Sequence, residues 1–472
     1  MNNFSRERFK TGEEYSRALF FLSPFIFLFS ISLFQVLNLT LFQGDKYQTI
    51  AESNRIYQKP ISPVRGFIYD RNGTLLAENI VQRDLYVTPA YIEDSAKTIL
   101  TLSNLLDMPY ELLEENFSRG VKKVKKFDSF PLVKALNEEQ IAKAKVNLDS
   151  ISGIEVKATL KRYVLHEETL AHVLGYVGDI SSEDIRRDKL LAELQNIQIG
   201  KTGIEKEFDY VLRGNPGIQT QERDVKGKLV RILDTQGAED GKDIYLTIDQ
   251  KLQDHLFKLF ENRRGALVAL EPKTGLVRAL ISSPSFNPNI LNSIVDTDEV
   301  ESLFSNKESP IFNRAISGQY PPASTLKPFV GLAAIENEVI SWDKKIKDDG
   351  EFYVEGDPRP YRGWKENGHG RVDMRKAIAE SSDVYFYNIA FDLTLAGIRP
   401  MLDSFGFGKK TGLTDFEANG LLPDKKWKLG YKGDFWFKGD TINLGIGQGY
   451  ILATPLQLAM AYSGLANKGV IY

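Results

Sequence analysis

YPPASTLKPF, at residues 320–329, marks the start of a helix and puts a hydroxyl three positions before an amine. Pro322 disfavours the α conformation in the residue before it, so no helix should begin before about Pro322. Pro328 has no backbone N–H and is tolerated only within the first turn of a helix. A helix that starts close to Ser324 satisfies both constraints. Ser324 and Lys327, at i and i+3, then lie on one face of it.

This placement suits a serine that is activated by an amine. Lys327 would lie at the positive end of the helix dipole, which disfavours its ammonium form and favours a base. A serine beside such an amine is a recognised arrangement for covalent acyl transfer. The Ser-x-x-Lys pattern alone is weak because it recurs by chance, and the alternative is a helix start with a solvated lysine. The pattern therefore predicts a Ser324 nucleophile only where other motifs agree.

Composition narrows the classes of function. The 472 residues are 42% hydrophobic and 26% charged, which is ordinary for a globular protein and long enough for more than one domain. A net charge of −3 gives no reason to expect nucleic acid as a partner. The absence of cysteine excludes disulfides and thiol nucleophiles. Four histidines leave a Ser-His-Asp enzyme open, but no Gly-x-Ser-x-Gly elbow supports one.

The N-terminal region is typical of a membrane anchor. Residues 1–17 are polar, whereas residues 18–42 contain no charged side chain and are rich in Phe, Leu and Ile. That run is long enough to cross a bilayer as a helix, with Pro24 tolerated near its start. The basic residues in front of it favour a cytoplasmic N-terminal tail and an extracytoplasmic remainder. A cleaved signal peptide is the main alternative, but the apolar run is long and lacks a clear small-x-small cleavage site.

A composition shift near residue 240 predicts a domain boundary. Residues 43–240 are mixed α/β and gather no catalytic groups, which indicates a spacer or docking module. Within this part, residues 65–73 are expected to be an extended segment that closes in an Asn-Gly turn. Residues 96–150 are expected to be helical, and residues 172–178 to form a short buried strand.

The second domain is expected over residues 241–472. Apolar strands at 265–270 and 276–281, joined by Glu-Pro-Lys-Thr-Gly, predict a hairpin. A helical stretch precedes the hairpin at 250–260, and the Ser324 helix follows it. The fold class is therefore a multidomain α+β or α/β protein whose second domain contains a sheet backed by helices.

Further short motifs occur along the chain. They are RGFIYDRNG at 65–73, GKTGIE at 200–205, NRA at 313–315, SSD at 381–383 and GIGQG at 445–449. Together with the YPP that precedes Ser324, they resemble the signatures of the class B penicillin-binding proteins, and most closely those of the branch that serves cell elongation. The resemblance runs from the anchor to the last residue. It implies a transmembrane helix, a non-catalytic pedestal over 43–240 and a serine transpeptidase domain over 241–472.

The resemblance implies a peptidoglycan D,D-transpeptidase that β-lactams inhibit. Ser324 would attack the penultimate D-Ala carbonyl of a stem peptide, with its own backbone N–H stabilising the oxyanion. Lys327 would take the proton, and Ser381 would relay it to the departing D-Ala. Asp383, where many relatives carry Asn, would orient Lys327 and Ser381. An acyl-enzyme divides a difficult amide exchange into two easier steps. Standing alone, the SSD motif is more simply a helix cap or a polar loop.

The sequence departs from the family in its third motif. A Lys-Thr-Gly or Lys-Ser-Gly strand should follow the second motif at a long distance, but the chain ends at Tyr472, 89 positions past Asp383 (472 − 383). The Lys-Thr-Gly triplets present begin at Lys201, Lys273 and Lys410, and all fit ordinary turns. We therefore expect a transpeptidase domain that is incomplete at its C-terminus, so that a protein ending at Tyr472 would be acylated poorly by penicillin.

A second departure concerns metal. By the same resemblance, some relatives hold zinc between two acidic residues, a histidine and a cysteine. Asp348 and His369 stand at two of those places, and Gly363 and Ser382 at the others. Two ligands cannot make a closed tetrahedral site. We therefore expect no metal and no other cofactor, and read His369 as a hydrogen-bonding residue.

Other functions stay open. A β-lactamase or a β-lactam sensor shares Ser-x-x-Lys, and a D,D-carboxypeptidase differs in its products. The chain could also be a non-catalytic, membrane-tethered interaction protein that docks through residues 43–240. By resemblance, its partners would be a SEDS-type glycosyltransferase and the scaffold of the rod-elongation complex, at the bacterial cytoplasmic (inner) membrane.

Overall fold

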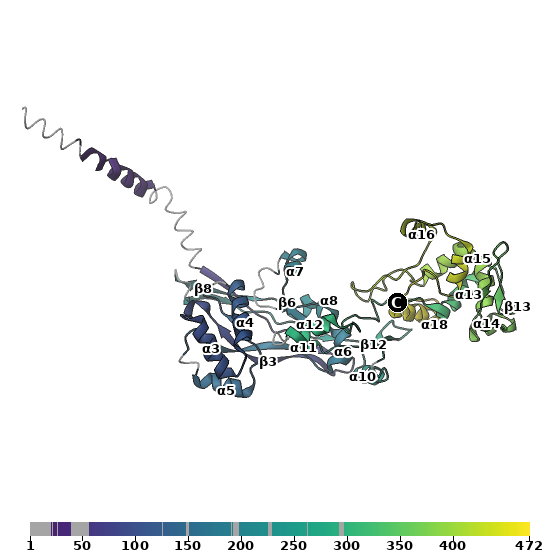
Figure 1. Cartoon of the computed structure of the whole chain (residues 1–472), viewed down its shortest axis with the longest axis horizontal. Coiled ribbons are helices and arrows are strands. Elements are labelled where there is room, and N and C mark those ends of the chain that lie inside the picture. The colour runs from purple at the N-terminus through teal and green to yellow at the C-terminus, as the bar shows by residue number, and fades with distance from the viewer. Residues whose placement is uncertain are drawn as a thin grey trace, which may run out of the picture. The chain divides into compact units, whose positions relative to one another are not determined.

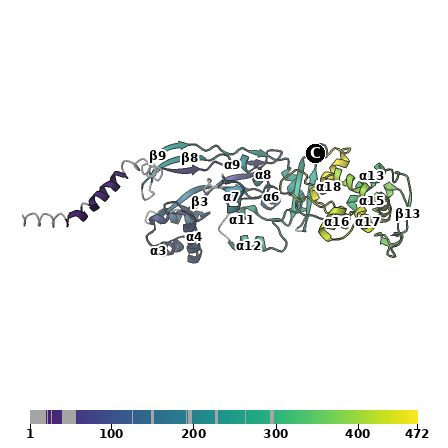
Figure 2. The ribbon, with the colours of Figure 1, turned by 90° about the horizontal axis from the view of Figure 1, so that it is seen from above.

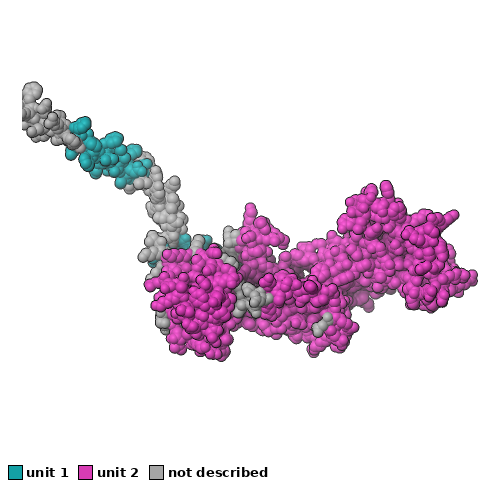
Figure 3. All heavy atoms as spheres, viewed as in Figure 1, with its two compact units in different colours: residues 1–61, 216–238 teal, residues 62–215, 239–472 magenta. Residues whose placement is uncertain are grey.

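The computed structural model describes residues 20, 22–25, 27–38, 56–124, 126–147, 151–189, 191, 198–224, 229–261, 263–291 and 297–472. Within them, residues 1–61 and 216–238 belong to one compact unit, and residues 62–215 and 239–472 to another (Figure 3). The expected tail, 1–17, lies outside the described residues, as do parts of the expected anchor, 18–42. In the described part of the chain, no helix is both long and apolar enough to cross a membrane.

The smaller unit contains a three-stranded antiparallel sheet. Its strands, in spatial order, are β1 (Ile56–Ile61), β8 (Gly217–Arg223) and β9 (Leu229–Gln236). Ile, Val and Leu are frequent in β1 and β9 and favour the extended conformation. Pro60 is tolerated because β1 is an edge strand, where a missing N–H interrupts no ladder on the outer side.

The larger unit contains a five-stranded sheet arranged around one long strand, β3 (Leu75–Val87). The other strands are β2 (Ile68–Tyr69), β4 (Phe130–Val133), β5 (Ile154–Val164) and β10 (Ile244–Tyr245). β5 pairs with β3 from Ala77↔Val164 to Val87↔Ile154. The Asn-Gly turn between β2 and β3 is confirmed, with Gly73 at φ 83°, where a side chain would be strained.

Two hydrophobic clusters share β3. Near its C-terminal end, Leu85 and Val87 pack with α3 (Ser95–Leu106) and α4 (Tyr110–Lys123). Near its N-terminal end, Leu76 and Ala77 pack with α6 (Glu167–Leu174) in a separate cluster. One strand therefore contributes buried side chains to two cores.

Two of the expected elements are wrong in part. The segment 96–150 is not helical throughout: β4 lies between α4 and α5 (Glu138–Asn147). A four-residue apolar run such as FPLV cannot be told from a helical segment by its periodicity. Residues 172–174 are the last turn of α6, and the strand is β6 (Val177–Asp179), paired with β7 (Gln198–Gly200). Gly175, at φ 78°, ends the helix between them.

The motifs at 65–73 and 200–205 meet at a buried ionic network. Glu205, which lies near the start of α8 (Gly203–Glu207), is fully buried. Its two carboxylate oxygens accept from Arg65 and Arg162, each at 2.6 Å. Arg65 also donates to Asp209 at 2.9 Å. This network ties β5 and the chain before β2 to α8, so these motifs have a structural role in the pedestal.

Helices dominate the C-terminal half of the larger unit. α13 (Lys327–Glu336), α15 (Asp383–Ser404) and α17 (Lys438–Gly445) share one core. α13 and α15 lie together in Figure 1, and Figure 2 shows all three helices close together. The expected hairpin is confirmed as β11 (Gly265–Leu270) and β12 (Val277–Ser283).

Short elements complete this half. α10 (Gln250–Lys258) and α18 (Pro455–Ala466) flank the hairpin. Two small antiparallel pairs lie close to α15: β13 (Ile346–Asp348) with β16 (Gly370–Val372), and β14 (Glu351–Phe352) with β15 (Tyr361–Arg362).

Candidate active site

Ser324 lies in a 3₁₀ turn, Ala323–Leu326, that leads directly into α13. The expected helix start is therefore confirmed, and its first turn is tighter than an α-helix. Ala323 has φ 51°, a strained value for a residue with a side chain, and its N–H donates to Gly447 O at 2.8 Å. This bond attaches the GIGQG segment to the residue before Ser324. The Ser324 side chain is exposed, as a group that meets a substrate must be.

A chain of hydrogen bonds joins the four predicted site residues. The Ser324 and Ser381 hydroxyl oxygens are 2.9 Å apart. Lys327 Nζ lies 3.1 Å from Ser381 Oγ and 2.6 Å from Asp383 Oδ1, and it also donates to Ser381 O at 2.9 Å. Among the described residues, Lys327 has no direct hydrogen bond to Ser324. The ion pair with Asp383 draws the amine away from the nucleophile, so Ser381 links the two.

The environment of Lys327 favours loss of its proton. Its side chain is 2% exposed, whereas that of Asp383 is 13% exposed. Burial lowers the pKa of Lys327 below the usual 10.5, although the hydrogen bond and charge of Asp383 act in the opposite direction. The balance leaves a lysine that releases a proton more easily than one in water and that is still held in place by a carboxylate.

The second motif lies where α15 begins. Ser382 is its N-cap and accepts from Tyr385 N, so Ser381 immediately precedes the cap and Asp383 is the first helical residue. Ser381 has φ 54°, in the left-handed region. The motif therefore has two roles: Ser382 caps the helix, as the alternative interpretation expected, and Ser381 and Asp383 belong to the polar chain.

Trp364 belongs to the site and was not predicted. Its backbone N–H donates to Asp383 Oδ2 at 3.0 Å, and its indole N–H donates to Ser381 O at 3.0 Å. The residue is nevertheless 66% exposed. A tryptophan in a glycine-rich loop carries no recognisable pattern, and the surrounding glycines were the available signal that this loop folds tightly.

Asp348, His369 and Ser382 form a second, buried cluster beneath the site. Asp348 Oδ2 lies 2.7 Å from His369 Nδ1 and 2.5 Å from Ser382 Oγ. These residues do not fit a metal site: the Asp348 and His369 side chains bond to each other, Ser382 supplies a hydroxyl, and Gly363 supplies no side chain. In the described part of the chain, no group of three or more His, Cys, Asp or Glu side chains could hold a metal ion.

The Lys-Thr-Gly triplets lie in turns and helix starts away from this polar chain. Lys201 pairs with Asp184, and the triplet at 273–275 forms the β11–β12 turn. In the third, Thr411 Oγ1 and Gly412 N both donate to the buried carboxylate of Glu417, at 2.7 Å each. Their contacts are structural.

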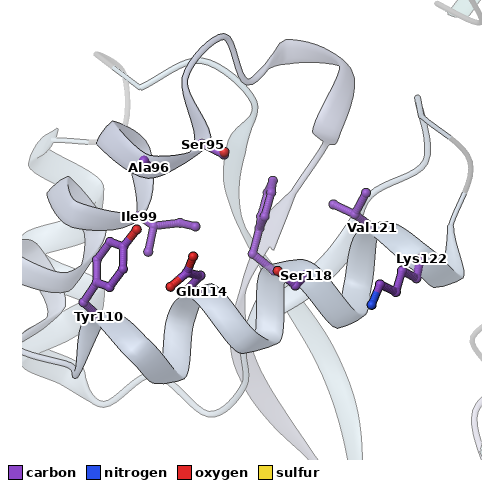
Figure 4. A pocket seen from close by; sticks show the side chains of 9 residues that line it. Ser95, Ala96, Ile99, Tyr110, Glu114, Ser118, Val121 and Lys122 are labelled. Atoms are coloured by element: carbon purple, nitrogen blue, oxygen red, sulfur yellow. The ribbon is translucent and has the colours of Figure 1, made fainter.

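A separate hollow of about 350 Å³ lies in the pedestal between α3 and α4 (Figure 4). Ile99, Tyr110 and Phe117 give it apolar walls, and Glu114 and Lys122 add opposite charges. None of the four predicted site residues lines it. It holds no arrangement suited to acyl transfer.

Comparisons with known proteins agree in both halves of the chain. Residues 60–246 match the model of the penicillin-binding protein dimerisation domain, and residues 265–472 match that of the penicillin-binding protein transpeptidase domain. Peptidoglycan D,D-transpeptidase MrdA of Acinetobacter baumannii is 38% identical over 91% of this chain, which spans 64% of that relative's length. MrdA of Escherichia coli K12 is 35% identical over 96% of this chain and 72% of its own length.

A solved structure is also similar. The complex between penicillin-binding protein PBP2 and MreC from Helicobacter pylori superimposes with a TM-score of 0.79 and 30% identity, covering 88% of this chain and 78% of that one.

Proposed function

The chain belongs to the penicillin-binding proteins, in the group of PBP2, and from that membership we propose that it is a serine-type peptidoglycan D,D-transpeptidase. The observation that carries the proposal is the hydrogen-bonded chain from Ser324 through Ser381 to Lys327. It combines a solvent-exposed hydroxyl, a second hydroxyl able to donate and accept, and a buried amine. These are the parts that acyl transfer through a covalent intermediate requires.

In the first step, Ser324 Oγ forms a bond to the carbonyl carbon of the penultimate D-Ala. Its proton passes through Ser381 Oγ to the neutral Lys327 amine. The C–N bond to the terminal D-Ala then breaks, and the proton returns through Ser381 to the departing nitrogen. Microscopic reversal describes the second step: the amine of an acceptor stem peptide attacks the ester, gives up a proton along the same path, and Ser324 leaves with a proton restored.

Asp383 has two opposing effects on this path. It holds Lys327 within hydrogen-bond distance of Ser381, which supports proton transfer. It also raises the pKa of Lys327, which burial lowers. We infer that its main contribution is geometric.

The cellular setting is part of the same proposal. Residues 18–42 would anchor the chain in the bacterial cytoplasmic membrane with the N-terminus inside, because that run contains no charge. The H. pylori PBP2 was solved with MreC, and we propose a rod-complex scaffold as a partner here too. A SEDS-type glycosyltransferase partner rests on the family resemblance.

Labelling of the full-length protein by a fluorescent penicillin tests the chemistry. We expect the wild type and Thr325→Ala to be labelled alike, slowly where the chain ends at Tyr472, and Ser324→Ala not to be labelled. Thr325 is a matched control because its neighbouring hydroxyl donates to Pro322 O and lies outside the polar chain. Equal labelling of Ser324→Ala and wild type would refute the nucleophile. Fast turnover of a chromogenic cephalosporin would indicate a β-lactamase, and release of D-Ala without cross-linked product would indicate a carboxypeptidase.

A further inference from the structure

We propose that Asp348, His369 and Ser382 form a hydrogen-bonded clamp that holds Ser381 and Asp383 in their reactive positions. Asp348 and His369 are then positioning residues for acyl transfer, although neither contacts the polar chain at Ser324. The inference rests on the function proposed above and adds residues to it.

The clamp is buried and closely spaced. The side chains of His369 and Asp348 are 3% and 1% exposed. Asp348 accepts three hydrogen bonds: from His369 Nδ1 at 2.7 Å, from Ser382 Oγ at 2.5 Å and from Gly350 N at 2.9 Å. A buried carboxylate is stable only when such partners compensate its lost hydration.

The protonation states follow from these partners. Burial tends to raise the pKa of Asp348, but the hydrogen bonds from Ser382, His369 and Gly350 outweigh it and lower the pKa. An ionised carboxylate only accepts, so His369 Nδ1 carries a proton and donates it. His369 Nε2 is buried and has no partner among the described residues. Nδ1 is therefore the only imidazole nitrogen with a hydrogen-bond partner in the described part of the chain.

Ser382 connects the clamp to the site along the backbone. Its hydroxyl donates to Asp348 and accepts from Tyr385 N, so one side chain both caps α15 and fixes the cap to β13. Ser381 and Asp383 are its two sequence neighbours. Ser381 has a strained φ of 54°, and such conformations persist only when the surrounding structure enforces them. The bond from Ser382 to Asp348 provides that constraint.

Trp364 connects the clamp to the site from the other side. Its ring lies against the His369 ring, with centroids 5.4 Å apart in an edge-on arrangement. Its backbone and indole N–H groups reach Asp383 Oδ2 and Ser381 O. Displacing the His369 ring would therefore also displace two donors to the second motif. Hydrogen bonds thus fix this region, in which Ser382 supplies a hydroxyl and Gly363 supplies no side chain.

Conservative variants of the full-length protein test the clamp. His369→Phe keeps a ring against Trp364 and removes the donor, and Asp348→Asn keeps the size and removes the charge. We expect both to lower the rate constant of acylation by a fluorescent penicillin roughly 10–100-fold, the range that small misplacements of reacting groups cause. The noncovalent dissociation constant should stay unchanged, because the clamp does not touch the ligand. His369→Asn retains a donor near the Nδ1 position but loses the ring against Trp364, so it should recover part of the rate.

A matched control separates positioning from general loss of stability. His172 also packs edge-on against an aromatic ring, Phe286, at 5.5 Å, but lies outside the site. We expect His172→Phe to acylate at the wild-type rate even where its melting temperature falls as far as that of His369→Phe. Wild-type acylation of His369→Phe, or equal rates in His369→Phe and His369→Asn, would overturn the proposal. If Asp348→Asn does not fold, the comparison of His369→Phe with His369→Asn still tests the proposal.

A second measurement does not depend on acylation. The Trp364 amide donates to Asp383, so its hydrogen exchange reports whether the loop stays in place. We expect faster exchange of this amide in His369→Phe than in His172→Phe, and equal exchange would overturn the clamp. Absence of acylation in the wild type would instead refute the proposed function. The hydrogen-exchange measurement would still test the clamp in that case.

Discussion

The hydroxyl oxygens of Ser324 and Ser381 lie 2.9 Å apart although 57 positions separate them in the sequence. Among the described residues of the second motif, Ser381 alone forms hydrogen bonds with both Ser324 and Lys327. A hydroxyl donates one hydrogen bond while accepting others, so it can pass a proton in either direction. Ser324, the proposed nucleophile, and Lys327, the proposed base, are therefore linked through Ser381, whose own backbone conformation is strained.

The acylation rate of the full-length protein should rise with pH as Lys327 loses its proton. Because burial lowers the pKa of Lys327, we expect the midpoint of this rise below 10.5. Asp383→Asn removes the carboxylate that raises this pKa, so the midpoint should move to lower pH even where the maximal rate falls. Rate constants for penicillin acylation measured across pH would check this. An unchanged midpoint in Asp383→Asn would contradict the ion pair as the cause.

Gly447→Ala should impair acylation far more than Gly449→Ala. Both glycines have positive φ, 70° and 82°, so alanine at either position should cost about 1–2 kcal/mol of stability. A Cβ on Gly447 would lie 2.1 Å from Ala323 O, whereas one on Gly449 meets its nearest atom at 3.5 Å.

The extra clash at Gly447 would displace the residue before Ser324, which by itself can cost roughly 100-fold in rate. Acylation kinetics and melting temperatures of the two variants would separate the shared strain from the specific displacement. Equal rates in the two variants would show that the Gly447–Ala323 contact does not position the nucleophile.

Glu205→Gln should destabilise the pedestal. It would remove the carboxylate that the buried Arg162 shares with the half-buried Arg65, and breaking a buried pair in this way typically costs about 3–5 kcal/mol. Glu207→Gln is the matched control on the same helix, because Glu207 is exposed and accepts from Thr414; we expect a change of about 0.5 kcal/mol or less. Denaturant unfolding monitored by far-UV circular dichroism would measure both, and similar losses in the two variants would contradict the prediction.

Combining Gly363→Asp with Ser382→Cys should create a zinc site. Gly363 has room for a side chain, because an added Cβ would meet Val384 Cγ2 at an ordinary 3.5 Å. The pair would supply a carboxylate and a thiolate to Asp348 and His369, which completes a four-ligand set. Metal analysis after dialysis should find about one zinc per chain in the double variant, as a tetrahedral site requires, and none in the wild type. Stoichiometric zinc in the wild type would reverse our reading of His369.

The sequence anticipated the residues of the polar chain because their positions follow from local rules. Two prolines confined the helix start to the region of Ser324, and the SSD motif offered a second hydroxyl and a carboxylate. Their meeting across 57 positions is a tertiary contact, which the family resemblance predicted and local rules did not.

The misses have physical causes as well. Trp364 reaches the site only because the β13–β16 and β14–β15 pairs fold its loop over α15, and no local pattern encodes that. Lys327, which was expected to take the proton of Ser324, bonds instead to Ser381 and Asp383, since a buried amine is stabilised by a nearby carboxylate.

The length of β3 has a consequence for how the pedestal unfolds. One unbroken strand supplies side chains to both clusters and pairs with β5 along most of its length. Unfolding of either cluster would therefore disturb the β3–β5 hydrogen bonds that the other cluster also needs. We expect the two to behave as a single cooperative block, with the slowest-exchanging amides along the β3–β5 ladder.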